Sequence, residues 1–253
     1  MDRKMSIVRL LAVLFCVWSP LTVAAFAQEQ EESFDRATKE IVIDLGASPY
    51  YPAGPTQRHG QLRCHLFQRF MVKELDWGQK GDDWISIIPN STRLTPCTHE
   101  HIESEIVVPE WQGRYFSGVK GSFIFIDDSD CTDRGCLFGV FEASTRKKIF
   151  EDQRRLSAKG KIEEIHFARI GESLVMRYPR VVEADCSLPE TKSECWNTIL
   201  HTTGLLPQPM PKCVGYSGPD ETDPSVVSFP VEITIPEFKM HLLPGPVACW
   251  AQD

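Results

Sequence analysis

The sequence is poor in positive charge. It has 27 lysine and arginine residues against 35 aspartate and glutamate residues, which gives a formal net charge of −8. Nucleic acids and anionic membrane surfaces bind proteins that present a basic face. The charge balance therefore argues against both as partners and leaves a protein or a small molecule as the expected ligand.

Long apolar runs are also scarce. The apolar run at residues 10–18 follows a basic start and is well below the ~20 residues of a membrane-spanning helix. It is followed by Pro20 and by Ala25 and Ala27, whose spacing suits a signal peptidase. We therefore expect residues 1–27 to be a secretion signal cleaved after Ala27, with a mature chain that is secreted or periplasmic and not inserted in a membrane.

Catalytic motifs are missing as well. No G-x-S-x-G sequence, the turn that presents a nucleophilic serine in many hydrolases, occurs in the chain. A reactive cysteine is disfavoured, because cysteines of an exported protein are normally oxidised. We expect no catalytic machinery and no bound cofactor.

Cysteine, in contrast, is plentiful. Of the nine cysteines, Cys16 lies in the expected signal. The remaining eight are Cys64, Cys97, Cys131, Cys136, Cys186, Cys195, Cys213 and Cys249. An even number in an exported chain predicts four disulfides. The short spacings favour pairing Cys131 with Cys136 and Cys186 with Cys195, and the other four then pair as Cys64 with Cys97 and Cys213 with Cys249, or crosswise.

The residue pattern is that of a mainly β protein. Short runs rich in β-branched and aromatic residues, bounded by Gly, Pro, Asp and Ser, predict strands. These runs lie at residues 41–45, 61–72, 84–88, 105–108, 122–126, 136–143 and 173–178. Polar turns at residues 144–147 and 171–173 predict two hairpins. We expect antiparallel sheets, arranged as a sandwich or as propeller-like hairpins.

Helical periodicity is weak, and the C-terminal part of the chain is rich in proline. The best helix candidates are residues 31–40 and a turn near residues 192–200. Residues 226–238 alternate like a strand, but Pro230 and Pro236 predict a position at a sheet edge. We expect an N-terminal segment at 28–57, a β-rich domain at 58–204, and an irregular, disulfide-bonded wrap at 205–253 that belongs to the same domain.

The stretch CTHEHIESE at residues 97–105 has the composition of a metal site. His99, His101 and Glu105 have the spacing H-x-H-x3-E, which resembles the first metal motif of the cupin family. The resemblance implies zinc or a related metal and a metal-dependent hydrolase or cupin-like protein. The sequence departs from that family at Arg93, where the family has glycine, and it lacks the later histidine motif. Using Cys97 as a ligand would also leave one cysteine unpaired, so an exposed polar strand or loop is the favoured interpretation.

A second cluster of possible ligands is acidic. Asp128, Asp130 and Asp133 lie close together in IDDSDCTDRG, and carboxylate oxygens on a turn are suitable calcium ligands. The EF-hand spacing is not met, because Asp133 and Gly139 stand where that motif needs Gly and Glu. A solvated acidic turn is the alternative.

The segment at residues 111–178 resembles a unit of uncharacterised secreted bacterial proteins. In that unit a G-x-Y strand, here at residues 113–115, precedes a cysteine-bridged turn and a hairpin whose turn has the form D-x-x-T-G-K. Glu142 and Arg146 replace the aspartate and the glycine of that turn. The resemblance implies a bacterial envelope setting and carries no catalytic residue. We therefore expect an exported, disulfide-stabilised binding or structural protein.

Overall fold

The computed structural model describes residues 30–51, 53–90, 96–108, 113–132, 134–156, 165–216 and 222–252. The strands are β1 (Gln30–Glu32), β2 (Lys39–Ala47), β3 (His59–Leu66), β4 (Phe70–Asp76), β5 (Trp84–Pro89), β6 (Ile106–Val107), β7 (Arg114–Lys120), β8 (Phe123–Asp128), β9 (Cys136–Glu142), β10 (Lys147–Arg154), β11 (His166–Ile170), β12 (Ser173–Glu183), β13 (Ser225–Ile235), β14 (Lys239–Leu242) and β15 (Ala248–Ala251). The helices are α1 (Leu188–Thr191) and α2 (Ser193–Thr203).

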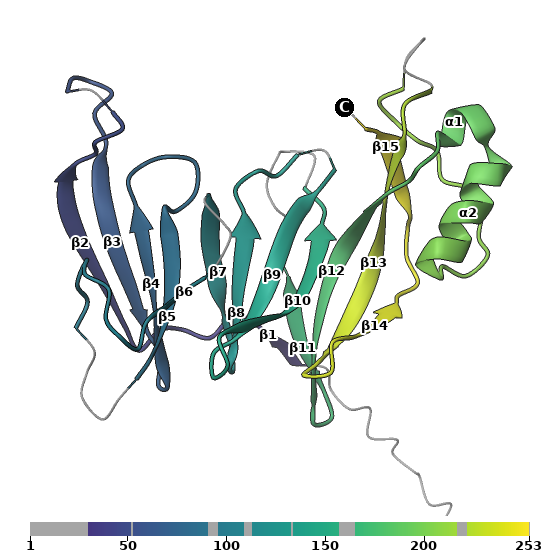
Figure 1. The fold of residues 1–253 in the computed structure, drawn as a ribbon. Helices are drawn as coiled ribbons and strands as arrows, with labels where there is room; N and C mark the ends of the chain where they lie inside the picture. The colour runs from purple at the N-terminus through teal and green to yellow at the C-terminus, as the bar shows by residue number, and fades with distance from the viewer. Residues whose placement is uncertain are drawn as a thin grey trace, which may run out of the picture.

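The strands form two antiparallel sheets, which confirms the predicted fold class. One sheet has the order β2-β3-β4-β5-β6, and the other has the order β1-β11-β12-β10-β9-β8-β7, with β13 on β12 and both β14 and β15 on β13. Strands β10 and β12 pair through one residue pair only, Arg154 with Arg180. The larger sheet is therefore divided there into a meander β7–β10 and a group around β12 and β13. Figure 1 shows the smaller sheet at one end of the molecule and the two helices at the other.

The meander β7–β10 is covered on both faces. In β8, Ile124 and Ile126 pack toward the smaller sheet, against a core that includes Val72 and Ile87. Phe125, which points the other way, belongs to the core formed with β11, β12 and β13. A strand with both faces buried has no polar alternation, which explains the continuous apolar runs at 122–126 and 136–143.

The two ends of the molecule are closed by other elements. On the outer face of the smaller sheet, Leu62, Cys64 and Ile88 form a third core with the partly buried Cys97 and Ile102. At the other end, α2 buries Trp196 and Ile199 against β13. No helix in the part of the chain that the structure describes is long and apolar enough to cross a membrane.

The cysteines form four disulfides, as their number predicts. The pairs are Cys64–Cys97, Cys131–Cys136, Cys186–Cys195 and Cys213–Cys249. Of the pairings left open for the four more distant cysteines, the structure has Cys64 with Cys97 and Cys213 with Cys249. Disulfides of this number indicate an oxidising compartment.

Two sequence-based predictions of secondary structure are wrong. Residues 61–72 form two strands, β3 and β4, joined by a turn in which Phe67 N donates to Phe70 O and the two rings stack. The turn was hidden because its central residues, Gln68 and Arg69, are not among the Gly, Pro, Asn, Asp and Ser residues that usually mark turns. Residues 31–40 contain no helix: β1 pairs with β11 and β2 begins at Lys39. Pairing with a distant strand outweighs weak helix propensity.

The edge position predicted for residues 226–238 is also wrong, because β13 is an inner strand. It pairs along β12 on one side and with β14 and β15 on the other. Pro230 lies opposite Pro179, and its carbonyl accepts from Leu243 N on the β14 side. The Pro230 nitrogen thus faces the interval between β14 and β15, where the sheet needs no donor. Of the irregular wrap expected at residues 205–253, residues 205–216 are irregular, whereas β14 and β15 are regular strands.

Candidate functional site

The stretch at residues 97–105 is a loop that is fastened to the smaller sheet. Cys97 is bonded to Cys64 on β3. The Glu105 side chain is only 1% exposed, and its carboxylate accepts from Lys73 Nζ at 2.8 Å and from Ser86 Oγ at 2.5 Å. Burial alone would raise the pKa of Glu105, but the hydrogen bonds from Lys73 and Ser86 outweigh it and hold that pKa below its usual range.

Lys73 completes this attachment. Its ammonium also donates to the carbonyls of Thr98 and Glu100, each at 3.1 Å, so its three N–H groups all have acceptors. The side chain is 1% exposed. Lys73 and Glu105 thus form a buried ion pair that connects the loop to β4.

The structure brings together two of the three residues of the H-x-H-x3-E motif. His101 Nδ1 lies 3.0 Å from Glu105 Oε1, and its ring packs on Trp84. The His99 ring lies next to Trp77 instead. Within the described ranges, no group of three or more His, Cys, Asp or Glu side chains is arranged to hold a metal ion.

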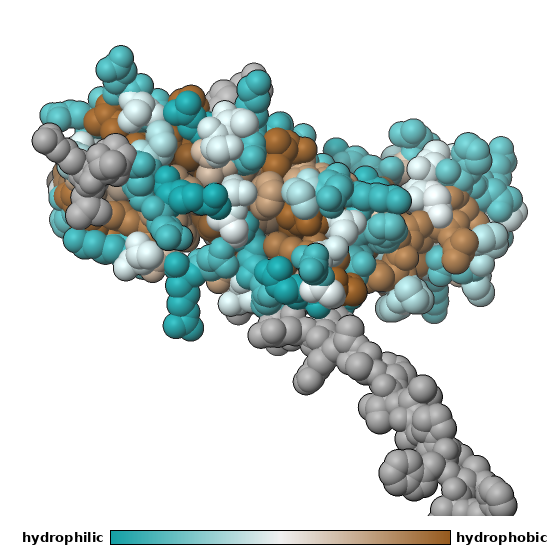
Figure 2. All heavy atoms as spheres, turned by 90° about the horizontal axis from the view of Figure 1, so that it is seen from below, coloured by the Kyte–Doolittle hydropathy of each residue, from teal (hydrophilic) through white to brown (hydrophobic). Residues whose placement is uncertain are grey.

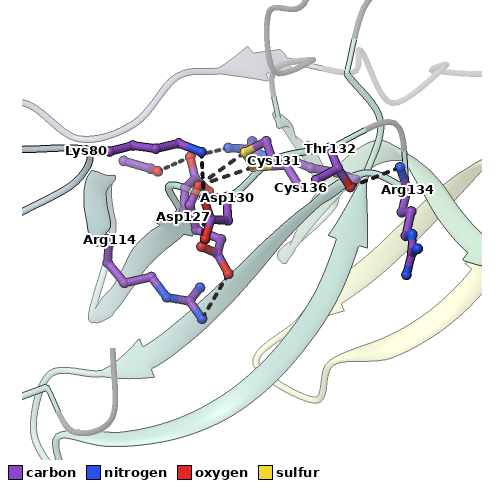
Figure 3. Close-up of a disulfide and its surroundings, with 11 residues drawn as sticks. Lys80, Arg114, Asp127, Asp130, Cys131, Thr132, Arg134 and Cys136 are labelled. Carbon is purple, nitrogen blue, oxygen red and sulfur yellow. Dashed lines mark hydrogen bonds and ion pairs between the residues drawn. A yellow bond between two sulfur atoms is a disulfide. The ribbon is translucent and has the colours of Figure 1, made fainter. Parts of the chain in front are cut away.

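The aspartates considered as calcium ligands contact basic side chains. Asp130 accepts from Lys80 Nζ at 2.5 Å, which lowers the pKa of Asp130, and Asp128 lies 3.4 Å from Arg114. Figure 3 shows Lys80, Arg114 and Asp130 around the Cys131–Cys136 disulfide. Asp133 lies outside the described residues. The two described aspartates are therefore held by salt bridges.

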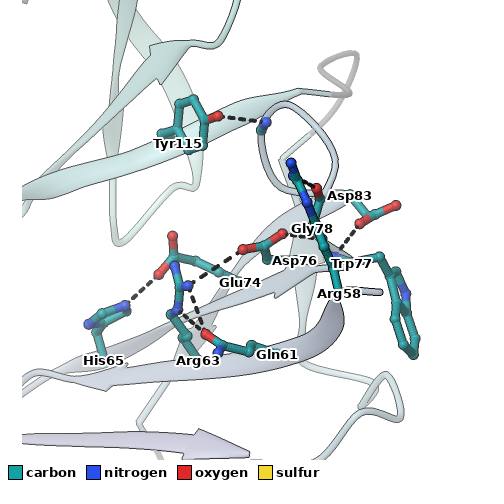
Figure 4. A network of polar contacts seen from close by, with 11 residues as sticks. Arg58, Gln61, Arg63, His65, Glu74, Asp76, Trp77, Gly78, Asp83 and Tyr115 are labelled. Atoms are coloured by element: carbon teal, nitrogen blue, oxygen red, sulfur yellow. Dashed lines mark hydrogen bonds and ion pairs between the residues drawn. The ribbon is translucent and has the colours of Figure 1, made fainter. Parts of the chain in front are cut away.

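A polar cluster that the sequence analysis missed lies on β3, β4 and the turn that follows β4 (Figure 4). His65 contacts Glu74 through Nε2 and lies 3.6 Å from Glu40 through Nδ1. Burial, together with the neighbouring Glu74, raises the pKa of Asp82 to about 9. Burial lowers the pKa of His65, but the two glutamates outweigh it and the net shift is upward. The sequence feature that could have revealed this cluster is the charged Glu74 within the otherwise mostly apolar strand β4.

A cleft of about 870 Å³ lies between the chain that follows β1 and strands β7, β8, β10 and β11. This size is within the range of small-molecule sites, about 300–1,000 Å³. Its lining includes Ser33, Phe34, Tyr115, Ser117, Asp127 and Arg154. We refer to it below as the β7–β8 cleft.

The polar floor of the β7–β8 cleft is a buried ion pair. Asp127 and Arg154 are 5% and 4% exposed, and Asp127 Oδ2 accepts from the Arg154 guanidinium and from the Ser117 hydroxyl. Among the described residues, Asp127 Oδ1 is buried and has no hydrogen-bond partner. Burial raises the pKa of Asp127 despite the contact with Arg154. An unpaired buried carboxylate oxygen is unfavourable, and this one is covered by protein atoms and does not open into the cleft.

The walls of the cleft are aromatic. Phe34 packs edge-to-face on Phe125 and Phe167, with ring centroids 5.2 and 5.0 Å away. Its ring lies over Gly118, where a Cβ atom would come within 2.6 Å. Tyr115 is 43% exposed, and its hydroxyl accepts from Gly81 N at 2.8 Å. Both rings are therefore held by contacts within the protein.

Sequence reasoning treated Asp127 as part of an acidic turn and passed over Ser117 and Arg154. The available signal was alternation in β8: Asp127 follows Phe125 on the same face of a strand that is apolar on both faces. Comparison of the chain with family models, with curated proteins and with solved structures finds no match. The resemblance to secreted bacterial proteins at residues 111–178 therefore stays a prediction.

Proposed function

We propose that the protein is an exported binding protein, located in the periplasm or outside the cell, that holds a small ligand in the β7–β8 cleft. The observation that carries the proposal is a cleft of about 870 Å³ whose lining combines the polar Ser117, Asp127 and Arg154 with the aromatic Phe34 and Tyr115. A few convergent polar groups within aromatic walls are typical of ligand sites. The four disulfides support the exported location.

The cleft can be blocked without changing its floor. Ser33 is exposed and lines the cleft, and its carbonyl accepts from Lys120 Nζ through the backbone alone. Ser33→Trp therefore fills the entrance and keeps that contact. Ser173→Trp, at the exposed turn between β11 and β12, is the matched control.

The experiment is a thermal-shift screen of the oxidised protein against a library of metabolites, sugars and peptides. We expect at least one compound to raise the melting temperature of the wild type and of Ser173→Trp by the same amount, while Ser33→Trp shows no shift. If every stabilising compound acts equally on Ser33→Trp, the ligand does not lie in the cleft and the proposal is wrong.

A further inference from the structure

The sequence contains the pattern L-L-P-x-P twice, at residues 205–209 and 242–246. The first stretch follows α2, and the second joins β14 to β15 (Figure 1). Both stretches line one cavity of about 290 Å³, which we call the proline cavity. Its lining takes Leu205, Leu206 and Gln208 from the first stretch and Leu242, Leu243 and Pro244 from the second. The fold thus brings two copies of one pattern, far apart in the sequence, to the same place.

Both stretches are attached to the body of the protein. In the first, the buried Trp196 donates from Nε1 to Gln208 O at 2.9 Å. In the second, Leu243 N donates to Pro230 O, and Gly245 lies so close to the Pro230 ring that a Cβ atom would come within 2.7 Å of it. The walls of the proline cavity are therefore fixed relative to α2 and β13.

The backbone of the first stretch is restricted to extended conformations. Every second residue from 207 to 211 is a proline, whose ring fixes φ. Each residue between them precedes a proline, which disfavours helical backbone angles. Residues 205–213 accordingly form neither helix nor strand. Such a chain favours the polyproline II conformation, whose carbonyls are free to accept hydrogen bonds from a partner.

The outer surface of this stretch is apolar and ends at a positive charge. Leu206 and Met210 are 78% and 43% exposed, and Pro207 and Pro209 are exposed between them. Figure 2 shows hydrophobic side chains gathered, among hydrophilic ones, at the end of the molecule that carries the helices. Lys212 is exposed and forms no ion pair with any residue that the structure describes. A complementary partner therefore has an apolar group next to a carboxylate.

The contact made by Trp196 indicates which apolar group fits. An aromatic ring with an N–H or O–H donor can stack on prolines and donate to a carbonyl of the same extended chain, and proline-rich segments are recognised in this way by aromatic grooves. Trp196 makes such a hydrogen bond from the inner side, at Gln208 O. The outer side offers exposed proline rings and, beside them, an apolar cavity.

We propose that the two L-L-P-x-P stretches form a docking surface for a partner protein, which inserts an aromatic side chain into the proline cavity and places a carboxylate beside Lys212. The surface shares no lining residue with the β7–β8 cleft. The inference therefore goes beyond the proposed ligand-binding function and does not depend on it.

The test is a selection of random peptides displayed on phage against the full oxidised protein, followed by fluorescence polarisation with the selected peptides. We expect these peptides to contain Trp or Tyr next to Asp or Glu, and replacing the aromatic residue by Ala should weaken binding at least about tenfold. Leu206→Glu, which places a charge at the cavity, should have an effect of the same size. Lys212→Glu should weaken binding about two- to fivefold.

The matched controls lie on β2, at the other end of the molecule (Figure 1). Val42→Glu and Lys39→Glu are the same two changes at exposed positions and should alter affinity less than about twofold. Melting temperatures show whether each variant is folded. Lys212→Glu changes only an exposed charge, so it keeps the test decisive if Leu206→Glu is destabilised.

Three results would overturn the proposal. The first is that no peptide is selected, or that the selected peptides lack aromatic residues. The second is that folded Leu206→Glu and Lys212→Glu bind the peptides as tightly as the wild type. The third comes from sedimentation of the protein alone: a dimer that Leu206→Glu dissociates would mean that the surface pairs with a second copy of the chain.

Discussion

The buried pair of Lys73 and Glu105 gives the sharpest test of the structural account. Lys73→Met removes the ammonium and leaves the Glu105 carboxylate buried in the loop that it anchors. Removing one partner of a buried ion pair costs about 3–5 kcal/mol, because the remaining charge is uncompensated. We expect a loss of that size in the free energy of unfolding at pH 7.

The pH dependence of the same variant has a predictable sign. In the wild type the pKa of Glu105 is lowered, so its contribution to stability is present above the pKa of the unfolded carboxyl and is lost as the pH falls. In Lys73→Met, burial dominates and raises the pKa of Glu105. The variant should therefore become less stable as the pH rises from about 4 to 7. In the wild type, Glu105 makes the opposite contribution to the pH dependence of stability.

The assay is urea denaturation of the oxidised protein at several pH values. Adding Glu105→Gln to Lys73→Met removes the buried charge and should recover part of the loss. Lys147→Met, at an exposed position of β10, is the control and should change stability by less than about 0.5 kcal/mol. A loss below about 1 kcal/mol in Lys73→Met, or no recovery in the double variant, would refute the reasoning.

Three further predictions concern other parts of the molecule. Replacing Cys64 and Cys97 by serine opens a loop with a sequence separation of 33 and should cost about 3–4 kcal/mol, measured by denaturant unfolding. Asp82 has a raised pKa of about 9, so its contribution to stability declines as the pH rises toward 9; Asp82→Asn should flatten this dependence, measured as melting temperature at pH 5 and 8. An unchanged pH slope would contradict the assignment. Gly118→Ala places a methyl group against Phe34 at a φ of +152° and should destabilise by about 1–3 kcal/mol; equal melting temperatures would show that the ring moves freely.

The sequence predicted the fold class and both named hairpins because turns and strand periods are local signals. The hairpin between β11 and β12, with its turn at Gly171, depends on residues next to one another in the chain. The local pattern of the sequence could not predict that β13 is an inner strand. That placement depends on Pro179 lying opposite Pro230, a match between distant segments.

The site was less predictable for the same physical reason. The residues of CTHEHIESE were noted from composition, but the partner that fixes Glu105 is Lys73, 32 residues earlier in the chain. In the β7–β8 cleft, Asp127 and Arg154 meet across strands β8 and β10. Local pattern identifies ionisable residues, and only the strand register decides which of them meet.

The order of the disulfides bears on how the chain acquires its structure. Each of the four disulfides joins two cysteines that follow one another along the chain, with sequence separations of 33, 5, 9 and 36. An oxidase that joins cysteines in the order in which they emerge would therefore produce the native bonds directly. A chain oxidised vectorially, from its N-terminal end onward, needs no exchange of mispaired thiols to reach this connectivity.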